Sequence, residues 1–456
     1  MKPAVFGISG LRGRVGEDLT PELAVGVARA FGRFLGPGVV AVGRDTRPSG
    51  PMLAAAVTAG LASAGSDVVD LGVCPTPTVL HFVRARGLAG GVIVTASHNP
   101  EEWNGLKFAG GDGVFLSPDD FARFRPLALD PPAPVAWPDC GGLSSDGAAV
   151  ADHISAIAGH ELFRAIPARL AGRPLRVGID AVNGAAAVAG PALCRALGAE
   201  PVTVNCATDR AALRRGFPRR PEPTPDHLAA LAELVRREEL AFGVGFDPDG
   251  DRAGLVDETG RPLSEQWTLC LACRFALALA PGPVVTNLST TRALDDVAAE
   301  FSVPVLRAPV GEAAVVARMR AAGSPVGGEG NGGVILPAVN PTRDGLVALA
   351  CALGLVASTG RPLSTHAAGL DGWQMAGTKL DLDRERFAGR AAALAAAFPG
   401  ATVDRQDGVR LEGKDFWLHA RPSNTEPMVR LIAEARGRDP SPEIERARAA
   451  LAGQEA

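Results

Sequence analysis

Short apolar segments of strand length alternate along this sequence with segments of helical length, and polar loops follow the apolar segments. In the first such unit, Thr20 and Pro21 supply an N-cap and a first-turn proline for a predicted helix, and residues 39–42 (VVAV) run directly into the polar sequence 43–47 (GRDTR). Apolar strand, polar loop and helix in repeated order are typical of βαβ units with parallel strands. The alternation therefore favours the α/β fold class.

Three such units are predicted, followed by a segment of different character. The predicted strands are residues 39–42, 68–71, 91–95, 175–180, 241–246, 284–287 and 303–307, and the later predicted helices are 52–64, 185–197, 226–238 and 265–279. A turn is predicted at residues 75–77 (PTP), and a linker at residues 130–146, where Pro, Gly and Ser cluster. After residue 358 the pattern changes, which predicts a smaller α+β domain closed by a helix at 442–452.

The charge balance and the cysteine content exclude several classes of partner. Lys and Arg total 46 and Asp and Glu total 50, a formal net charge of −4, whereas a general nucleic-acid binder carries a basic excess. The sequence shows neither a signal peptide nor a membrane-spanning segment, so we expect a cytoplasmic protein with no membrane partner. Cys270 and Cys273 lie in an apolar helical segment and are expected to serve packing rather than redox or metal chemistry.

The first of four loops that carry reactive side chains is residues 95–100 (TASHNP), at the end of a predicted strand. A hydroxyl at a strand end beside an imidazole can act as a nucleophile or phosphoryl acceptor, which makes Ser97 and His98 candidates. Neighbouring residues of a strand point to opposite faces, so the two side chains need a turn to cooperate. An ordinary polar turn with an exposed hydroxyl is the alternative, and without further evidence it is the better one.

The second loop, residues 247–252 (DPDGDR), follows the predicted strand 241–246. The alternating Asp247, Asp249 and Asp251 can converge on one divalent cation, and oxygen ligands without His or Cys favour Mg²⁺ over zinc. Together with Glu258 these residues fit the spacing of a calcium-binding EF-hand loop, but Arg252 stands where that loop needs glycine and the flanks are strand-like. A solvated acidic turn is the remaining alternative.

The third loop, residues 327–333 (GGEGNGG), contains the G-x-G-x-x-G pattern of dinucleotide-binding folds. That pattern requires a following helix, and the strand-like sequence 334–337 (VILP) follows here. A tight turn that presents Glu329 and Asn331 to polar groups of a ligand is favoured, with a plain glycine-rich hairpin as the alternative.

The fourth loop, residues 421–427 (RPSNTEP), combines an arginine, hydroxyls, an amide and backbone N–H groups. These groups suit a phosphate cradle. The candidate phosphate ligands are Arg421, Ser423, Asn424 and Thr425. The alternative is a helix N-cap at Ser423 or Asn424.

In this order and spacing, the four loops resemble those of the α-D-phosphohexomutases, the family of phosphoglucomutase, phosphomannomutase and phosphoglucosamine mutase. The resemblance extends over nearly the whole chain. The further matching sequences are residues 7–13 (GISGLRG), 43–47 (GRDTR), 104–107 (NGLK), 217–218 (FP) and 221–223 (PEP).

The resemblance implies four domains around a central cleft, each supplying one loop. Three are α/β domains with mixed sheets at residues 1–145, 146–254 and 255–365, and a smaller C-terminal α+β domain covers residues 366–456. The protein is expected to be a monomer or homodimer that acts on a small-molecule phosphosugar.

The resemblance also implies roles for individual residues. Ser97 would be a phosphoserine and would hold Mg²⁺ together with Asp247, Asp249 and Asp251. Arg252 would approach the transferring phosphate, and Arg12, His98 and Lys107 would support phosphate binding and proton transfer. Glu329 and Asn331 would contact sugar hydroxyls, while Arg421, Ser423, Asn424 and Thr425 would hold the phosphate that is not transferred.

The implied reaction interconverts hexose 6-phosphate and hexose 1-phosphate. Phospho-Ser97 would donate its group to the substrate, and the resulting hexose 1,6-bisphosphate would turn end for end and return its other phosphate. Phosphoryl transfer needs charge neutralisation and in-line positioning, which placed cations supply. A Mg²⁺-dependent sugar phosphatase and a non-catalytic sugar-phosphate-binding protein are the alternatives from other functional classes.

Departures from the pattern of mannose and glucose mutases bear on the choice of sugar. Asn331 and Gly333 stand where many of those enzymes have Ser and His, and residues 310–312 (VGE) stand where they often have Gly-His. The lysine common near residues 288–292 (LSTTR) is missing. These features look closer to phosphoglucosamine mutases of the archaeal type. Glucosamine phosphate is therefore the expected substrate, with a phosphomannomutase/phosphoglucomutase as the alternative.

Overall fold

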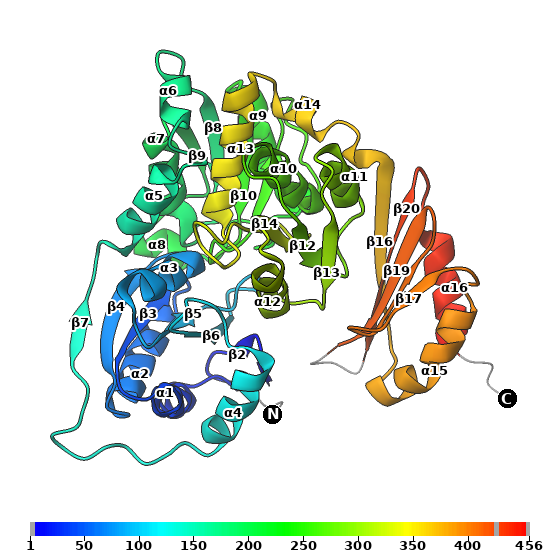
Figure 1. Ribbon diagram of the computed structural model, residues 1–456. Helices are drawn as coiled ribbons and strands as arrows, with labels where there is room; N and C mark the ends of the chain where they lie inside the picture. Colours follow the sequence, from blue (N-terminus) through cyan, green and yellow to red (C-terminus); the bar gives the residue numbers. More distant parts are fainter. Residues whose placement is uncertain (1–4, 424–427, 453–456) are drawn as a thin grey trace.

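A computed structural model describes residues 5–423 and 428–452 and arranges them around four β-sheets (Figure 1). The predicted class is confirmed: three α/β domains with mixed sheets precede a smaller α+β domain. The four sheets lie within residues 5–145, 176–256, 284–335 and 373–436, and the exact domain boundaries stay a prediction. In Figure 1 the first domain (blue to cyan) and the fourth (orange to red) lie at opposite sides, with the green and yellow domains above them.

The first domain contains a seven-stranded sheet. In spatial order its strands are β1 (Val5–Gly7), β2 (Gly10–Arg14), β6 (Trp103–Gly110), β5 (Gly90–Val94), β3 (Val39–Arg44), β4 (Asp67–Val73) and β7 (Leu143–Ser145). Its helices are α1 (Pro21–Leu35), α2 (Gly50–Ala62), α3 (Thr76–Arg86) and α4 (Pro118–Leu129). The side chain of Thr20 accepts a hydrogen bond from the backbone N–H of Leu23, so the predicted N-cap of α1 is confirmed.

One local prediction in this domain is wrong. Residues 75–77 were expected to form a turn, but α3 begins at Thr76 and continues to Arg86. A proline in the first turn of a helix loses no hydrogen bond, because that N–H has no intrahelical partner. The Pro-Thr-Pro sequence therefore starts a helix as readily as it makes a turn.

The second and third domains each hold a four-stranded mixed sheet. The second sheet has the order β11 (Ala253–Val256), β10 (Phe242–Phe246), β8 (Arg176–Asp180) and β9 (Glu200–Val204), with helices α5 (Ala149–Gly159), α6 (Ile166–Leu170), α7 (Ala186–Ala196), α8 (Arg210–Leu213) and α9 (Ala229–Arg237). The third has the order β13 (Val305–Ala308), β12 (Val284–Asn287), β14 (Val326–Glu329) and β15 (Gly333–Ile335), with helices α10 (Glu265–Leu279), α11 (Ala293–Glu300), α12 (Glu312–Ala322) and α13 (Gly345–Thr359).

The fourth domain is an antiparallel five-stranded sheet with two helices on one face. Its strands, in spatial order, are β16 (Trp373–Leu380), β20 (Val429–Arg436), β19 (Phe416–Pro422), β18 (Val409–Glu412) and β17 (Thr402–Asp404), and its helices are α15 (Arg384–Ala396) and α16 (Ser441–Ala452). The short helix α14 (Leu363–Ala367) precedes it in the chain. The predicted closing helix at 442–452 is confirmed within one residue.

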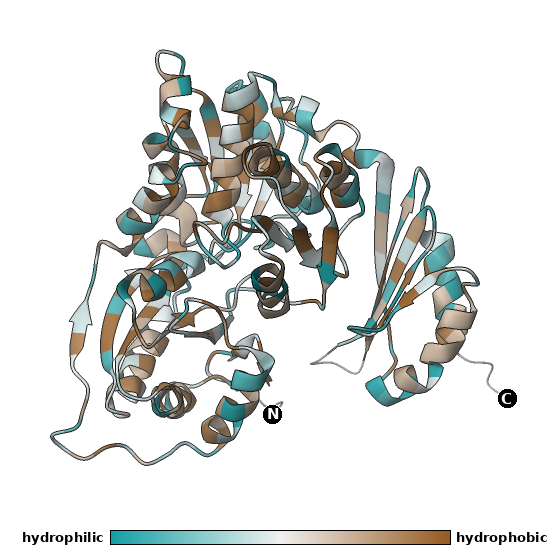
Figure 2. Cartoon of the chain, viewed as in Figure 1, coloured by the Kyte–Doolittle hydropathy of each residue, from teal (hydrophilic) through white to brown (hydrophobic). Residues whose placement is uncertain are grey.

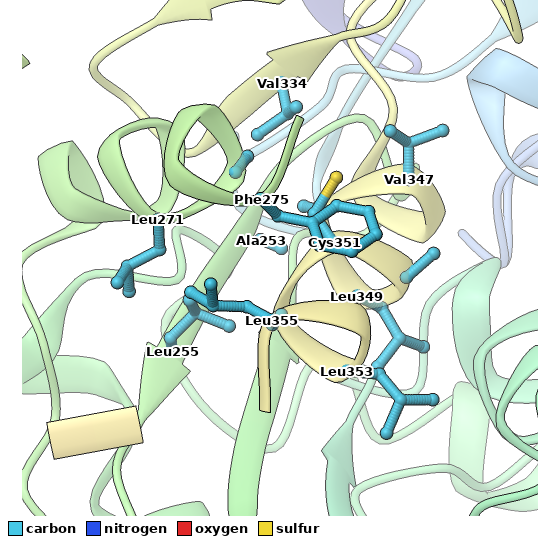
Figure 3. Close-up of a cluster of buried hydrophobic side chains, with 14 of the residues drawn as sticks. Ala253, Leu255, Leu271, Phe275, Val334, Val347, Leu349, Cys351, Leu353 and Leu355 are labelled. Atoms are coloured by element: carbon cyan, nitrogen blue, oxygen red, sulfur yellow. The ribbon is translucent and has the colours of Figure 1, made fainter. Parts of the chain in front are cut away.

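Apolar side chains form a continuous core through the second and third domains. Brown apolar residues concentrate in the strands and in the helices against them (Figure 2), and Figure 3 shows Phe275 of α10 beside Cys351 of α13. Cys270 and Cys273 are fully buried in α10, as predicted for packing residues. Because the two domains share this core, the loops at their strand ends are held in a fixed relation.

No single helix among the described residues is long and apolar enough to cross a membrane. Only the helix pair Gly345–Thr359 and Leu363–Gly372, which is bent by 105°, reaches that length and apolar content together.

Candidate active site

The first two polar loops meet where strands of the first and second sheets end. β5 ends at Val94 and leads into the serine loop, and β10 ends at Phe246 and leads into the aspartate loop. The hydroxyl oxygen Oγ of Ser97 lies 3.3 Å from Oδ2 of Asp247, although 150 positions separate the two residues in the sequence. The fold therefore brings the candidate nucleophile and the candidate metal ligands together.

Ser97 is held in an uncommon backbone conformation. Its φ is 52°, in the left-handed region that residues other than glycine rarely adopt, and its backbone N–H donates to Oγ1 of Thr95 at 2.9 Å. This conformation provides the turn that Ser97 and His98 need, and their side chains approach to 3.5 Å. Ser97 is not the exposed hydroxyl of an ordinary polar turn, because only 1% of the residue is accessible to solvent. Loops from two domains cover it, which the sequence of its own loop does not indicate.

The three aspartates form a compact buried cluster. Each offers a carboxylate oxygen, and these oxygens lie within 4.8 Å of one another. Burial, together with Asp251 and Asp249, raises the pKa of Asp247 well above its ordinary value. Burial alone would also raise the pKa of Asp251, but Arg343, Lys107 and Arg252 outweigh it and hold this pKa below its usual range. Three carboxylates this close repel one another unless cations compensate their charge.

The cluster fits a divalent cation. Among the described residues, Oδ1 of Asp249 and Oδ1 of Asp251 are buried and have no hydrogen-bond partner, and a hard divalent cation takes such oxygen ligands. Glu258 takes no part, because its carboxylate accepts hydrogen bonds from the backbone N–H and the hydroxyl of Ser364. The EF-hand alternative therefore loses one of its ligands.

Positively charged side chains surround the carboxylates. Lys107 of β6 places its Nζ 2.6 Å from Oδ2 of Asp249 and 3.1 Å from Oδ2 of Asp251. Burial alone would lower the pKa of Lys107, but these two carboxylates outweigh it and raise this pKa, so the ammonium group stays charged. Arg252 donates through Nη1 to Glu222 at 3.0 Å.

His98 is neutral in this surrounding. Nη2 of Arg252 lies 3.1 Å from Nδ1 of His98. Burial, Arg252 and Arg12 lower the pKa of His98 to about 2. Arg12 of β2 donates through Nη1 to Oδ1 of Asn99 at 3.1 Å, and its Nε is buried with no hydrogen-bond partner among the described residues. An imidazole with so low a pKa is a weak base, so in this arrangement His98 is suited to hydrogen bonding beside Ser97 rather than to accepting its proton.

The glycine-rich loop is a hairpin between the antiparallel strands β14 and β15. Because a strand follows it, the dinucleotide-binding reading is excluded. Glu329 is buried and accepts hydrogen bonds from Nδ2 of Asn287 at 2.8 Å and from the backbone N–H of Gly311 at 3.0 Å. Oδ1 of Asn331 is buried without a hydrogen-bond partner among the described residues, so it is free to accept a bond from a ligand. Gly332 has φ 87°, and a Cβ there would lie 2.5 Å from the carbonyl oxygen of Ala253.

The fourth loop begins at the end of β19. Nε of Arg421 lies 2.7 Å from Oδ2 of Asp407, and the same carboxylate oxygen accepts a hydrogen bond from the backbone N–H of Val310 at 3.0 Å. The structure thus ties the candidate phosphate ligand to the segment that also contacts Glu329. The backbone N–H of Ser423 donates to the carbonyl of Met428 at 2.7 Å. Asn424 and Thr425 lie outside the described residues.

Sequence reasoning missed Arg343, which joins the second and third loops. Its guanidinium contacts three buried carboxylates: Nη2 lies 2.8 Å from Asp251, Nη1 lies 2.9 Å from Glu329, and Nε lies 3.0 Å from Glu312. Asp344, the next residue, caps α13 by accepting from the backbone N–H of Leu346 at 3.0 Å. The available signal was a polar sequence, residues 340–344 (NPTRD), directly before an apolar helix.

Comparisons with known proteins agree with this architecture. Four consecutive segments match the phosphoglucomutase/phosphomannomutase descriptions: alpha/beta/alpha domain I at residues 3–124, domain II at 151–260, domain III at 264–371 and the C-terminal domain at 379–452. A probable phosphoglucosamine mutase of Methanopyrus kandleri is 37% identical over 445 residues, covering 96% of this chain and 95% of that protein.

Two further relatives carry different descriptions. A phosphoglucomutase/phosphomannomutase of Thermococcus kodakarensis is 35% identical over 445 residues, covering 95% of each chain. The crystal structure of a phosphoglucomutase/phosphomannomutase family protein from Burkholderia thailandensis superposes with a TM-score of 0.83 at 28% identity, covering 99% of both chains.

Proposed function

Because this chain belongs to the phosphoglucomutase/phosphomannomutase family of phosphohexomutases, we propose that Ser97 carries the phosphoryl group of a mutase that acts on glucosamine phosphate. The observation that carries the assignment of Ser97 is its Oγ, which lies 3.3 Å from a buried carboxylate of the candidate metal cluster. A hydroxyl beside such a cluster can be deprotonated, phosphorylated and dephosphorylated without large movement of the loop.

The charged groups around Ser97 suit phosphoryl transfer. We propose Asp247, Asp249 and Asp251 as the protein ligands of Mg²⁺, which when bound would neutralise charge on the transferring phosphoryl group. Arg252, Arg12 and Lys107 are proposed to contact phosphate oxygens. His98 is neutral, and its Nδ1 lies 3.5 Å from Oγ of Ser97. These side chains are fixed before the substrate arrives, so little reorganisation accompanies charge transfer.

The substrate has to bind in two orientations, since either of its phosphates must reach Ser97. Arg421 and Ser423, with Asn424 and Thr425, are proposed to hold the phosphate that is not reacting. Glu329 and Asn331 are proposed to bind sugar hydroxyls between the two phosphate sites. The contacts of Glu329 with Gly311, and of Val310 with Asp407, join the sugar loop to the phosphate loop.

Glucosamine phosphate is proposed over mannose or glucose phosphate for two reasons. Asn331 and Gly333 replace the Ser and His of many mannose and glucose mutases, and the relative from Methanopyrus kandleri is described as a probable phosphoglucosamine mutase. The relative from Thermococcus kodakarensis is described as a phosphoglucomutase/phosphomannomutase, which supports the alternative of a mutase for mannose or glucose phosphate.

A bisphosphate-primed isomerisation assay tests both activity and substrate. Glucosamine, glucose and mannose 1-phosphates are compared by kcat/KM, with inorganic phosphate release measured in parallel. We expect the 6-phosphate of glucosamine to form fastest, with phosphate release far slower than isomerisation. A higher kcat/KM for mannose or glucose 1-phosphate would overturn the choice of sugar. Phosphate release without any isomerised sugar would replace the mutase with a phosphatase.

Removal of divalent cations should abolish turnover. The carboxylates of Asp247, Asp249 and Asp251 repel one another, and the phosphoryl group adds further negative charge to this site. Dialysis against EDTA is expected to reduce activity to background, and Mg²⁺ addition to restore it. The measurement is the isomerisation rate against free Mg²⁺ concentration. Full activity in the chelated sample would exclude a metal from the mechanism.

Replacement of Arg421 with alanine should mainly weaken phosphate binding. A hydrogen-bonded charge at a phosphate contributes about 1.5–3 kcal/mol, so KM for the phosphosugar is expected to rise by roughly 10- to 100-fold. Steady-state kinetics measure this change. Arg436→Ala on β20 is the matched control, because Arg436 is largely exposed and pairs with Asp296. An unchanged KM for every phosphosugar in Arg421→Ala would remove Arg421 from the phosphate site.

A further inference from the structure

Arg47 uses every donor of its guanidinium group on the protein itself. It follows β3 in the sequence and is 1% exposed. Nη1 donates to the carbonyl oxygens of Pro100 at 2.6 Å and Trp103 at 3.0 Å. Nη2 donates to the carbonyl oxygens of Ser97 and Asn99, both at 2.7 Å. Three of its five N–H groups therefore hold the backbone of the serine loop, and a fourth holds the first residue of β6; we call these four hydrogen bonds the Arg47 clamp.

The fifth N–H of Arg47 binds Asp45, which directly follows β3. Nε of Arg47 donates to Oδ2 of Asp45 at 3.0 Å, and Oδ1 of Asp45 accepts the backbone N–H of Arg47 at 2.9 Å. Oδ2 of Asp45 also accepts the hydroxyl of Thr95 at 2.7 Å, and that hydroxyl accepts the backbone N–H of Ser97 at 2.9 Å. The backbone N–H and C=O of Ser97 are thus both fixed from one buried ion pair.

We propose that Arg47 is a positioning residue that keeps Ser97 in its left-handed conformation with Oγ directed at Asp247. A serine with φ 52° returns to an ordinary conformation unless its surroundings hold it there. That return would turn the side chain away from the aspartate loop. Since no N–H of Arg47 is left over, it acts through the loop and does not bind phosphate. This inference rests on the proposed role of Ser97 as phosphoryl carrier.

A ligand role and a purely structural role predict different kinetics. A phosphate-binding arginine would raise KM when it is replaced, whereas a positioning residue would lower the rate of the chemical step. A purely structural arginine would lower stability and leave the properties of the folded fraction unchanged. A misplacement of about 1 Å at a reacting atom can cost about 100-fold in rate, so the three roles are separable.

The test is Arg47→Lys, which keeps the charge beside Asp45 but cannot reproduce the four hydrogen bonds to the carbonyl oxygens. Hexose 1,6-bisphosphate is the phosphoryl donor, and intact mass and peptide mapping measure the rate at which Ser97 becomes phosphorylated. We expect this rate and kcat to fall by roughly 100-fold, with KM changed by less than about threefold. Arg307→Lys is the matched control, because the Arg307 side chain is only 11% exposed and its guanidinium pairs with Asp295 of α11. Its strand, β13, carries no candidate site residue.

A second variant guards against misfolding of the first. Thr95→Val removes the hydroxyl that binds the backbone of Ser97 but leaves Arg47 in place, and it should lower the same rate by at least about tenfold. The proposed role of Arg47 would be overturned if Ser97 became phosphorylated in both variants as fast as in Arg307→Lys. A rise in KM at unchanged kcat would overturn it as well. Absence of phosphate on Ser97 in the unaltered protein would instead contradict the proposed function, so the two failures are distinguishable.

Discussion

Ser97→Ala is expected to reduce turnover by at least about 1,000-fold while the protein remains folded. The hydroxyl is the proposed carrier of the phosphoryl group, and alanine has no oxygen to accept it. The stability cost is expected to be small, on the order of 1 kcal/mol, because the side chain loses little more than its 3.3 Å hydrogen bond to Asp247. The measurements are the isomerisation rate primed with hexose 1,6-bisphosphate and the midpoint of thermal unfolding.

Ser324→Ala is a suitable control for this substitution. Ser324 is also a buried serine, and its hydroxyl donates to the carbonyl oxygen of Val326 at 2.8 Å, on a strand of the third domain. It should show a similar change in unfolding midpoint with full activity. If Ser97→Ala retained more than a few per cent of the original turnover, another residue would have to carry the phosphoryl group.

The parts of the site that could be predicted are those whose residues lie next to one another in a single loop. Alternating carboxylates after an apolar strand predict the aspartate loop as a metal site, and the structure brings those carboxylates together. The glycine-rich loop was correctly separated from a dinucleotide site, because the residues that follow it are strand-like and form β15. Local pattern therefore sufficed wherever one loop determines the chemistry.

What local pattern did not predict depends on contacts between loops. Arg343 contacts Asp251 across 92 positions, and no property of the sequence around either residue indicates that pair. The clamp made by Arg47 lies within a recognisable motif, yet its function follows only from carbonyl groups 50 and 52 positions away. The burial of Ser97 belongs to the same class, since the aspartate loop of another domain covers it. Propensity and periodicity carry no information on such distant contacts.

These distant contacts are also the ones whose loss is expected to lower the free energy of unfolding most. Charges in water gain little from pairing, whereas buried charges lose their hydration and depend on their partners. The active site contains both signs of charge at high density, with Lys107 and Arg343 fully engaged with Asp249, Asp251 and Glu329. Lys107 thereby links the first domain to the second, and Arg343 links the second domain to the third, so residues of the proposed site also hold the domains together.

Arg343→Met should accordingly destabilise the protein far more than loss of an ordinary arginine. Removal of one partner from a buried ion pair costs about 3–5 kcal/mol, because the remaining charge stays buried without compensation. Here three carboxylates, those of Asp251, Glu329 and Glu312, lose their shared cation at once. We expect a fall in the unfolding free energy of at least about 3 kcal/mol, measured by urea titration of the cooperative transition that includes α10 and α13.

Arg320→Met provides the comparison that isolates burial. Arg320 pairs with Asp112 at 2.8 Å between the third and first domains, but both side chains are about half exposed, so its loss should cost no more than about 1 kcal/mol. The substitution is the same in both variants, and so is the loss of one positive charge. Equal effects of the two substitutions would mean that water reaches the carboxylates around Arg343. A large effect in Arg343→Met alone requires that these carboxylates remain dehydrated, which is also the condition under which the nearby cations act strongly on a phosphoryl group.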